Sequence, residues 1–461
     1  METLDSINSW KEGIHALNDN FFPELGRKEV IDAATSYVHG LLLPLAKKNG
    51  WSIAEATGKR NPQAHQRLLR SAVWEHEELR RNRHEWIVEH YDSPGGILVF
   101  DETGFLKRGT QSVGVARQYS GTAGKTENCQ IAVFAAYVSE ERHVLWDGHL
   151  YLPKQWCEDT ERLKKAGVPA EVSFRTKPDQ AWEMYKAAKD SGLSIQWVAA
   201  DTVYGGNPGL RANLIDVRQK FVMAVQRDTH VYSGRPLKMH PAGPRRRRRR
   251  RARRNKKSLR VDEMVDKWPR EAFRPVVVGD GSKGPRRYLW AARRVAIASS
   301  NGRVDDLWLL VRRSVTTPEK TAYYLAWAPA KTPLETLARI ASNRWHIEEC
   351  FAEAKGEVGL ADYQVRKWIP WHRHIELAML AHLILVDLRR RHGEADEELP
   401  SLTIPEIRRL LEMVIPPPPR PPTARLQWSK WRRRHNQRAR LSHYRRRFRP
   451  PPKIRDGKVT L

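Results

Sequence analysis

The sequence predicts a mixed α/β fold, in which helices flank a sheet of parallel and antiparallel strands. The prediction rests on three short apolar runs that follow one another between residues 95 and 138. Helical and strand-like patterns then alternate from residue 178 to residue 225. Neighbouring strands followed by alternating helices and strands are typical of such a sheet. The 461 residues are enough for about two to four folding units.

The strand candidates of this region are short and are bounded by polar or turn-forming residues. Strands are expected at 97–100, 113–119, 130–138, 195–200 and 221–225. Helices are expected between the later strands, at 178–191 and 207–220. Asp101 and Asp201 directly follow two of the apolar runs. Functional groups of open α/β sheets collect outside the carboxyl ends of the strands, so both aspartates are candidate site residues.

Residues 1–90 have a helical pattern, and part of it has the outline of a helix-turn-helix. Ser52 is expected to cap a short helix, Gly58 suits a turn, and Asn61-Pro62 fits the start of a second helix. An ordinary helical hairpin with a polar face fits the same pattern, and this alternative stays open. In the helix-turn-helix interpretation, the second helix offers these side chains to DNA: Gln63, His65, Gln66, Arg67 and Arg70.

Residues 229–314 interrupt the α/β rhythm. Seven consecutive arginines stand at 245–251, and further Lys and Arg residues follow up to residue 260. A block of like charges cannot pack against itself, so we expect it at the tip of a solvated loop. Strand-like runs follow at 273–278, 288–298 and 307–312. The interval is therefore predicted to be a β-rich insertion, and its basic loop supplies three candidate DNA contacts: Arg245, Arg246 and Arg247.

The last third of the chain is predicted to be helical and then strongly basic. Helices are expected at 333–358, 371–391 and 404–414, before a run of prolines at 416–419. The tail interleaves Trp, Tyr and Phe with arginines, among which Arg432 and Arg433 are candidate DNA contacts. Such a tail is either poorly ordered without a partner or a helical arm that lies along phosphates.

These patterns suggest a chain of five parts. The expected parts are a helical DNA-binding domain over 1–90, a first core segment over 91–228, the β-rich insertion over 229–314, a second core segment over 315–395, and a basic Pro/Arg-rich arm over 396–461.

The charge balance points to a polyanionic partner. Lys and Arg number 82 against 53 Asp and Glu, which gives a formal net charge of +29. Nucleic acid and an anionic membrane surface would both attract such a chain. The longest apolar helix candidate, 375–388, is interrupted by charged residues and is too short to span a bilayer. Three scattered cysteines and the lack of a signal-peptide pattern favour an intracellular protein. Nucleic acid is therefore the favoured partner.

Asp101 and Asp201 become chemically suggestive if their strands are neighbours. Adjacent central strands would bring the two carboxylates within a few ångströms of each other. Their repulsion would then be relieved by a divalent cation. An aspartate after a strand is also a common helix cap or turn residue, so the pair alone does not decide between the two roles.

The helix predicted around residue 345 adds a third acidic side chain. On an α-helix Arg344 lies about 40° from Glu348 and Lys355 about 20° from it, whereas Glu349 and Glu353 point about 100° and 140° away. A carboxylate flanked by two cations suits a site for a metal ion and phosphate. A solvated charged face would show the same pattern.

Several blocks in order resemble one known family. Asp101-Glu-Thr-Gly-Phe105, Val113-Gly-Val-Ala-Arg-Gln-Tyr-Ser-Gly-Thr-Ala-Gly124 and Glu127-Asn-Cys-Gln130 resemble the first catalytic block of bacterial insertion-sequence transposases of the IS701 group, close relatives of the IS4 group. Tyr151-Leu-Pro153 and Ala200-Asp-Thr-Val-Tyr-Gly205 are similar to the middle and second blocks. A Tyr-x2-Arg-x3-Glu-x6-Lys signature of the wider superfamily is similar to the spacing of Arg344, Glu348 and Lys355. Ala341 stands at the position of its tyrosine. The resemblance covers roughly residues 95–390.

The resemblance implies an RNase H-like catalytic core with Asp101, Asp201 and Glu348 as an acidic triad. By the same resemblance, the triad holds two Mg²⁺ or Mn²⁺ ions: one activates water or a 3′-hydroxyl, and the other stabilises the leaving oxygen. Transposases of the IS4 type also carry a β-rich insertion between the second and third acids. The implied partners are double-stranded DNA and, in the synaptic complex, a second copy of the chain. Neither a membrane nor a small-molecule cofactor is expected, and the expected location is the bacterial cytoplasm at the nucleoid.

Weaker candidates surround this triad. Lys107 and Arg108 follow the first acid and are candidate phosphate contacts, as are Arg344 and Lys355. Trp345 is expected to pack in the core, although stacking on a base is the alternative. Two rival functions also stay open. One is a catalytically silent DNA-binding protein derived from a transposase, and the other is a stand-alone nuclease of the same fold.

Overall fold

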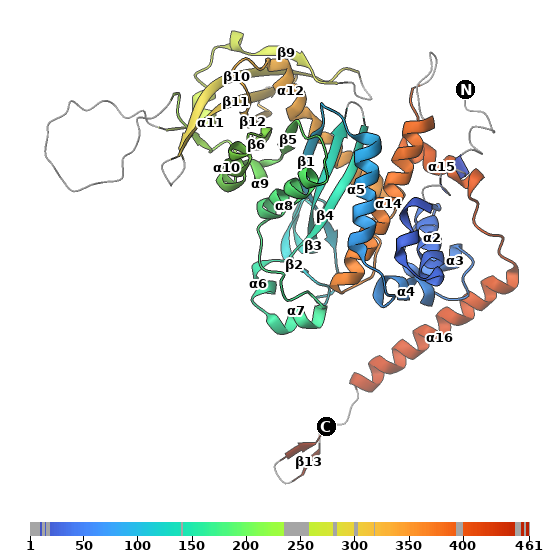
Figure 1. Cartoon of the computed structure of the whole chain (residues 1–461). Helices are drawn as coiled ribbons and strands as arrows, with labels where there is room; N and C mark the ends of the chain where they lie inside the picture. Colours follow the sequence, from blue (N-terminus) through green and yellow to red (C-terminus); the bar gives the residue numbers. More distant parts are fainter. Residues whose placement is uncertain are drawn as a thin grey trace.

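A ten-stranded sheet forms the centre of the computed structural model (Figure 1). The structure describes residues 19–139, 142–234, 258–279, 284–298, 303–317, 319–392, 400–447, 453–455 and 458–460, together with Trp10, Lys11 and Ile14. The strand order is β2-β3-β1-β5-β6-β12-β11-β10-β9, and β4 pairs with β3. The bounds are β1 Ile97–Leu106, β2 Ala116–Ser120, β3 Lys125–Ser139, β4 Arg142–Tyr151, β5 Trp197–Ala200, β6 Lys220–Val225, β9 Arg274–Val277, β10 Arg287–Ala298, β11 Val304–Ser314 and β12 Thr321–Trp327.

The sheet is mixed, because β5 lies parallel to both β1 and β6 whereas the other pairs among the described strands are antiparallel. Helices pack against it, so the predicted fold class, a mixed sheet flanked by helices as in RNase H-like cores, is confirmed. The strands predicted at 273–278, 288–298 and 307–312 are present as β9, β10 and β11. They extend the central sheet, because β12 joins β11 to β6.

Strand β1 is longer than the sequence predicted. Its pairing with β5 ends at Phe100 opposite Ala200, but its antiparallel pairing with β3 continues to Leu106 opposite Cys129. Asp101 therefore lies within a strand, which corrects the expectation that it follows one. The prediction located the end of the parallel ladder rather than the end of the strand.

Other element boundaries also differ from the sequence-based expectation. Strand β4 had not been predicted, although it pairs with β3 along most of its length. The helix expected at 207–220 ends at Asp216, because Arg218 adopts a left-handed conformation with φ of 56° before β6 begins. The helix expected at 333–358 is divided at Arg344 into α12 Leu334–Asn343 and α13 Trp345–Glu357.

Helices cover both faces of the sheet beside β1. Successive strand residues point to opposite faces. Asp101 contacts Arg344 at the start of α13, whereas the next residue, Glu102, contacts Lys177 at the start of α8 (Lys177–Asp190). The helices α12 and α13 therefore lie on one face and α8 on the other.

The remaining short elements are η1 Pro23–Leu25, α6 Lys154–Cys157, α7 Thr160–Ala166, α9 Thr202–Gly205, α10 Pro208–Asp216, β7 His230–Val231, β8 Leu259–Arg260, α11 Val261–Val265, η2 Arg270–Ala272, β13 Lys453–Arg455 and β14 Lys458–Thr460.

The first ninety residues are helical in their described part, as predicted. The helices are α2 Lys28–Leu42, α3 Gly50–Ala56, α4 Gln63–Arg70 and α5 His76–Tyr91. The cap of α3 is Asn49 rather than Ser52, whose side chain closes the capping box from the third helical position. Helix α4 begins one residue later than predicted, and the Asn61 side chain accepts a hydrogen bond from the Gln63 amide.

Helix α14 (Trp368–His392) is buried along most of its length and joins the N-terminal helices to the sheet. It packs against α2, α4, α5 and β4 (Figure 1). Because it is covered on all sides, its apolar residues show no single stripe, and its polar residues require buried partners. Among the described residues, no helix combines the length and hydropathy that a membrane span requires.

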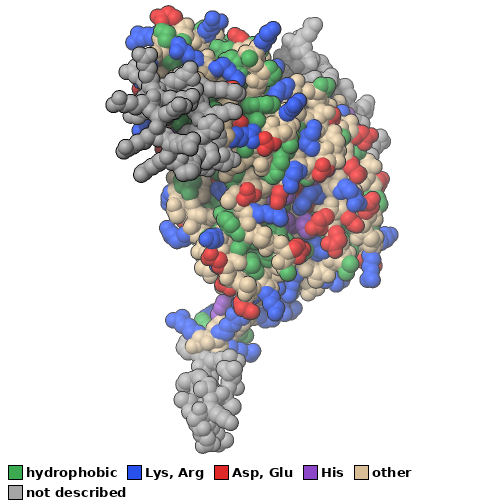
Figure 2. All heavy atoms as spheres, turned by 60° about the vertical axis from the view of Figure 1, so that its left-hand side comes forward, with side chains coloured by type: hydrophobic (Ala, Val, Ile, Leu, Met, Phe, Trp, Pro, Cys, Tyr) green, Lys and Arg blue, Asp and Glu red, His purple; other side chains and the backbone are tan. Residues whose placement is uncertain are grey.

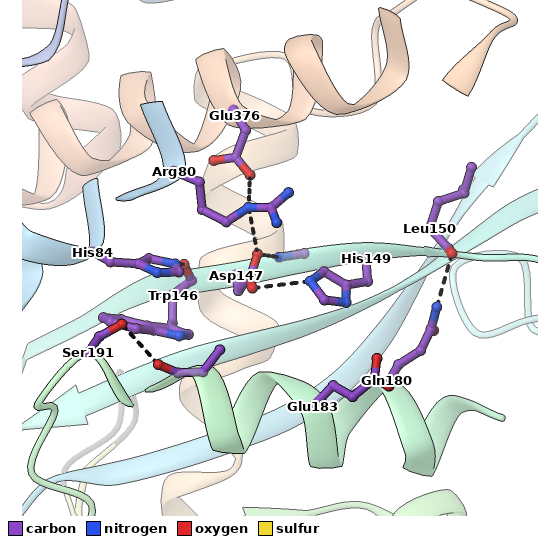
Figure 3. A network of polar contacts seen from close by, with 12 residues as sticks. Arg80, His84, Trp146, Asp147, His149, Leu150, Gln180, Glu183, Ser191 and Glu376 are labelled. Atoms are coloured by element: carbon purple, nitrogen blue, oxygen red, sulfur yellow. Dashed lines mark hydrogen bonds and ion pairs between the residues drawn. The ribbon is translucent and has the colours of Figure 1, made fainter. Parts of the chain in front are cut away.

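A buried ionic network fastens α14 to α5 and β4 (Figure 3). The Glu376 carboxylate contacts Arg83 at 3.0 Å and Arg80 at 2.8 Å, and Arg80 reaches Asp147 at 3.4 Å. Burial alone would raise the pKa of Glu376, but Arg83 and Arg80 hold that pKa below its usual value. Three elements that are distant in sequence thus share one charge network.

Helix α15 (Ile404–Val414) has the predicted bounds, and α16 (Pro422–Arg447) realises the predicted helical arm. The first half of α16 is anchored on the N-terminal helices. Trp428 is 3% exposed and donates a hydrogen bond from Nε1 to the Lys59 carbonyl. The Trp431 ring meets the Trp51 ring edge-on, with centroids 4.8 Å apart. The second half of α16 extends away from the body (Figure 1).

The substitution Glu376→Gln tests the network in Figure 3. It leaves the fully buried guanidinium of Arg83 without its anion, so we expect a loss of about 3–5 kcal/mol in the free energy of unfolding. The folded-state pKa lies below the unfolded value, so the stabilisation is present above about pH 4 and is lost as the pH falls further. The deficit should therefore shrink in acid. The measurement is denaturant unfolding at pH 7 and at pH 3.5.

Glu24→Gln is the matched control, because Glu24 pairs with Arg81 at 3.2 Å while both side chains are more than half exposed. We expect it to cost less than about 1 kcal/mol. Equal losses for the two variants would contradict the role assigned to the buried network.

Candidate active site

Three carboxylates meet where the parallel pair β1–β5 ends. Phe100 and Ala200 are register partners, so Asp101, within β1, lies beside Asp201, the first residue after β5. Oxygen atoms of Asp101, Glu102 and Asp201 lie within 4.8 Å of one another, a separation that suits a shared metal ion. The structure therefore brings together the two aspartates that the sequence paired, and it adds Glu102.

Asp201 also performs the local role that the sequence left open. It is the N-cap of α9, and its Oδ1 accepts a hydrogen bond from the Val203 amide at 2.8 Å. Asp101 Oδ1 similarly accepts from the Glu102 amide at 2.8 Å. Each of these backbone bonds uses one carboxylate oxygen and fixes the side chain. Capping and metal ligation are thus compatible, because an ionised carboxylate has about four lone-pair sites and these backbone bonds occupy only some of them.

The site holds more negative charge than its own cations neutralise. Burial, followed by the charge of Asp201, raises the pKa of Asp101 to about 7, even though Arg344 acts in the opposite direction. Burial and the charge of Glu102 raise the pKa of Asp201 as well. Adjacent carboxylates that resist ionisation in this way are stabilised as anions by a bound cation.

Arg344 connects this cluster to Glu348. One guanidinium nitrogen lies 3.1 Å from Asp101 Oδ2 and the other lies 2.6 Å from Glu348 Oε1. The division between α12 and α13 places Arg344 at the junction of the two helices. The Arg344 side chain is about one quarter exposed, whereas that of Glu348 is about one third exposed. The predicted third acid therefore lies at the same site, linked to the first by a bridging cation.

Lys355, on α13, contacts β1 at Thr103, two residues beyond Asp101. Its Nζ donates to Thr103 Oγ1 at 2.6 Å and approaches Thr122 Oγ1 at 3.2 Å. Thr103 and Asp101 share a face of β1, so α13 lies over this face with Arg344 at one end and Lys355 at the other. Burial lowers the pKa of Lys355 to about 8. The shared helix face inferred from the sequence is thus directed at β1.

Glu102 was missed at the sequence level. Its carboxylate accepts from Lys177 Nζ at 2.7 Å and from the Tyr204 hydroxyl at 3.0 Å. Because successive strand residues face opposite sides of the sheet, the Glu102 side chain points away from α13. Alternation alone would therefore have excluded Glu102 from the predicted site. It joins the cluster because Tyr204, in α9 directly after Asp201, belongs to the same turn. The only indication in the sequence was that Glu102 directly follows the candidate Asp101.

The neighbours of Glu348 on α13 turn elsewhere. Glu349 contacts His346 at 2.7 Å, and Glu353 contacts His382 at 3.0 Å. Trp345 is 46% exposed, so the expectation that it packs in the core was wrong. It stands beside Arg344 at the start of α13, where the turn between two helices leaves its ring uncovered.

The predicted phosphate contacts after Asp101 differ in their surroundings. Lys107 Nζ lies 3.5 Å from the centroid of the Tyr363 ring, and burial lowers the pKa of this lysine to about 8. Arg108 is exposed on the segment that follows β1. Lys107 is therefore engaged with the protein in this structure, and its contact with phosphate stays a prediction.

The other candidate DNA contacts are spread over three segments. Gln66, Arg67 and Arg70 are exposed on α4, whereas His65 is fully buried and contacts Ser36, so the expectation that His65 is available to DNA was wrong. On α16, Arg433 is exposed while Arg432 forms an ion pair with Glu55. Arg245, Arg246 and Arg247 lie outside the described residues.

Basic side chains are interspersed with acidic ones on one face of the body and are concentrated on the helix α16. On the face in Figure 2, Lys and Arg alternate with Asp and Glu over the whole body. The arm formed by α16 ends in Arg445, Arg446 and Arg447.

Comparison with protein-family models decides the relationship. The model described as DDE superfamily endonuclease matches residues 20–285, which is more than half of the chain and includes Asp101 and Asp201. The chain belongs to this family. Glu348 lies beyond the matched residues, so the family match does not test its assignment as the third acid, and among the described residues only its ion pair with Arg344 links it to the carboxylate cluster.

A curated relative supports the same relationship. The chain is 29% identical over 216 residues to a protein of Microchaete diplosiphon named "Probable transposase for insertion sequence element IS701". The match covers 46% of this chain and 52% of that protein, so the chain spans about half the length of the relative. The resemblance to the IS701 group that the motifs indicated is confirmed.

The choice of Glu348 over its neighbour can be tested directly. Glu348→Gln removes an ionised carboxylate, and a neutral amide is a poor ligand for Mg²⁺, so cleavage should fall by at least about 10²-fold while DNA binding persists. Glu349→Gln should retain cleavage within about tenfold, because that side chain turns to His346. The assay is cleavage of a duplex bearing the element end in Mg²⁺ and in Mn²⁺, with binding measured in parallel. An inactive Glu349→Gln beside an active Glu348→Gln would show that the wrong glutamate was assigned.

Proposed function

We propose that the protein is the transposase of an insertion sequence. It binds the terminal inverted repeats of its element as double-stranded DNA, cleaves the strands at the ends, and joins a 3′-hydroxyl to target DNA. The observation that carries this proposal is the convergence of Asp101 and Asp201 from two parallel strands with Glu348 from a helix across the sheet. Membership of the DDE superfamily endonuclease family and the similarity to an IS701 protein support it.

The residues at this site fit a pair of divalent cations such as Mg²⁺ or Mn²⁺. Asp101, Glu102 and Asp201 offer carboxylate oxygens, which are the ligands that these hard cations prefer. Glu348 offers a further carboxylate on the other side of Arg344. The raised pKa of Asp101 indicates a local excess of negative charge, and Arg344 already neutralises part of it. Asp101, Asp201 and Glu348 would hold the ions, which supply an activated oxygen nucleophile and stabilise the leaving oxygen.

The protein's own side chains provide positioning and positive charge. Arg344 holds Asp101 and Glu348 in one geometry and presents its guanidinium at a half-open site, where phosphate oxygens are suitable acceptors. Lys355 fixes β1 beyond Asp101 through Thr103. Tyr204 and Lys177 fix Glu102 from the other face. No side chain of the set is placed as a covalent nucleophile, so the chemistry is direct transfer of a phosphoryl group between oxygens.

DNA recognition is assigned to the helical N-terminal part and to the basic segments. The exposed α4 side chains Gln66, Arg67 and Arg70 suit a DNA-facing helix, and the net charge of +29 favours backbone binding. We also propose the five-part division of the chain. Its first part, residues 1–90, is not separate from the core, because α5 packs against α14 and β4. Synapsis of two element ends further implies a homodimer on DNA, acting at the nucleoid in the bacterial cytoplasm.

Two rival functions predict different products. A catalytically silent DNA-binding protein would bind the ends without cleaving them, and the close approach of Asp101 to Asp201 disfavours it. A stand-alone nuclease would cleave without joining, and it would have no need of the basic arm formed by α16.

The deciding experiment is a strand-transfer assay. Duplexes bearing the element end are incubated with supercoiled target plasmid and Mg²⁺ or Mn²⁺, and joined products are sequenced. We expect joining by the wild type and none by Asp101→Asn or Asp201→Asn, with end binding retained by all three. Cleavage without joining supports the nuclease, and binding without cleavage supports the silent protein. Either result would overturn the proposal.

The arm formed by α16 offers a matched pair of arginines. Arg433 is exposed, whereas its neighbour Arg432 is engaged with Glu55. If the arm lies along phosphates, Arg433→Gln should weaken binding and reduce the slope of log K against log salt concentration by about one unit. Arg432→Gln should change the slope less and should instead lower the melting temperature. Fluorescence anisotropy at several salt concentrations, alongside thermal melts, measures both. An unchanged slope for Arg433→Gln would remove this residue from the DNA interface.

A further inference from the structure

A second cluster of metal-ligating side chains lies on α13, away from Glu348. One ring nitrogen each of His143 and His346 and a carboxylate oxygen of Glu349 lie within 4.8 Å of one another. The three residues come from two elements, since His143 is on β4 and the others are on α13. No role in the proposed chemistry has been assigned to any of them.

Local geometry explains how the three side chains converge. His346 and Glu349 are three residues apart on one helix, a spacing that places both on the same face. His346 Nδ1 lies 2.7 Å from Glu349 Oε2. Helix α13 packs across β4, which brings the His143 ring against the His346 ring with centroids 5.0 Å apart and planes inclined by 25°. Two imidazoles and one carboxylate therefore share a small volume.

A second layer of side chains orients His143. Its Nε2 lies 3.5 Å from Glu353 Oε2, and the same oxygen lies 3.0 Å from Nε2 of the fully buried His382. His143 is 7% exposed, and among the described residues its Nδ1 has no hydrogen-bond partner. A buried ring nitrogen without a partner requires an explanation. A histidine that uses one nitrogen on a carboxylate and leaves the other free has the arrangement typical of a metal ligand.

We propose that His143, His346 and Glu349 bind one transition-metal dication of the Zn²⁺ class. Imidazole donors select Zn²⁺, Co²⁺ or Ni²⁺ over Mg²⁺, which prefers oxygen ligands. Three protein ligands leave a fourth tetrahedral position for water, and Glu349 is sufficiently exposed for solvent to reach it. Glu353 acts behind His143 as the group that fixes its ring, and His382 fixes Glu353.

The bound ion would fasten the helix that carries Glu348 to the sheet. Glu349 directly follows Glu348, and His346 stands two residues from Arg344. A metal bridge from these residues to β4 would restrict rotation and sliding of α13 over the sheet. The site is therefore a structural clamp behind the carboxylate cluster. It is distinct from that cluster in donor chemistry, and the inference stands whether or not the protein transposes DNA.

Metal binding by the full-length protein tests this inference. The protein is stripped with a chelator, dialysed and titrated with Co²⁺, whose visible absorption reports coordination, and then with Zn²⁺ as competitor. Bound metal is counted by elemental analysis. With a tenfold excess of Mg²⁺ present to occupy the carboxylate cluster, we expect one Co²⁺ per chain with a tetrahedral absorption spectrum, and we expect Zn²⁺ to abolish that spectrum.

Three variants and two controls locate the ion. His143→Gln and Glu349→Gln should each weaken Co²⁺ binding by more than about 100-fold, and Glu353→Gln by about 10–100-fold. His443→Gln, at an exposed position on α16, and Asp101→Asn, in the carboxylate cluster, should leave the absorption unchanged. Zn²⁺ should raise the melting temperature of the wild type and of both controls but not that of Glu349→Gln. Glu349 is the most exposed of the three ligands, so this variant keeps the test valid if His143→Gln does not fold.

Two outcomes would overturn the inference. One is the absence of a stoichiometric Co²⁺ or Zn²⁺ complex in the wild type. The other is binding that Asp101→Asn abolishes while His143→Gln and Glu349→Gln leave it intact, since the ion would then belong to the carboxylate cluster. Failure of strand transfer leaves these readouts unaffected, so the two proposals can fail separately.

Discussion

The repulsion between the carboxylates of Asp101 and Asp201 is the constraint around which the structure is organised. Parallel pairing of β1 with β5 forces the two side chains together, and burial makes their ionisation costly. A folded protein tolerates such a pair only where cations and fixed hydrogen bonds compensate for it. Arg344 and the backbone amides of Glu102 and Val203 supply part of this compensation, and the proposed function assigns the rest to divalent cations.

The rest of the fold holds those compensating groups in place. Arg344 reaches Asp101 because α12 and α13 change direction at that residue, and α13 is in turn held against β1, β3 and β4. Helix α14 supports α13 from behind and is itself fastened by Glu376 to α5. The N-terminal helices are thus part of the support of the candidate active site as well as a candidate surface for DNA.

Sequence reasoning was effective where a local pattern has one structural meaning. The apolar runs before Asp101 and Asp201 identified the central strands, and helical spacing separated Glu348 from Glu349. It was less effective where pairing partners decide the outcome. The extension of β1 beyond Asp101 depends on β3, and the place of Glu102 depends on Lys177 and Tyr204, which are distant in sequence. The exposure of Trp345 depends on a helix junction that periodicity does not reveal. The burial of His65 depends on Ser36 and Tyr37 of α2, against which its ring packs.

The order of strands in the sheet has a consequence for biosynthesis. Strand β6 ends at Val225, yet its partner on one edge, β12, does not begin until Thr321, and Glu348 follows later still. During translation the edge of β6 stays unpaired until almost a hundred further residues have been synthesised. Unpaired edges of this kind are prone to intermolecular association, and pairings between distant segments form slowly. A chain interrupted before β12 would therefore expose this strand edge to intermolecular association, and the complete acidic set can assemble only after Glu348 has been synthesised.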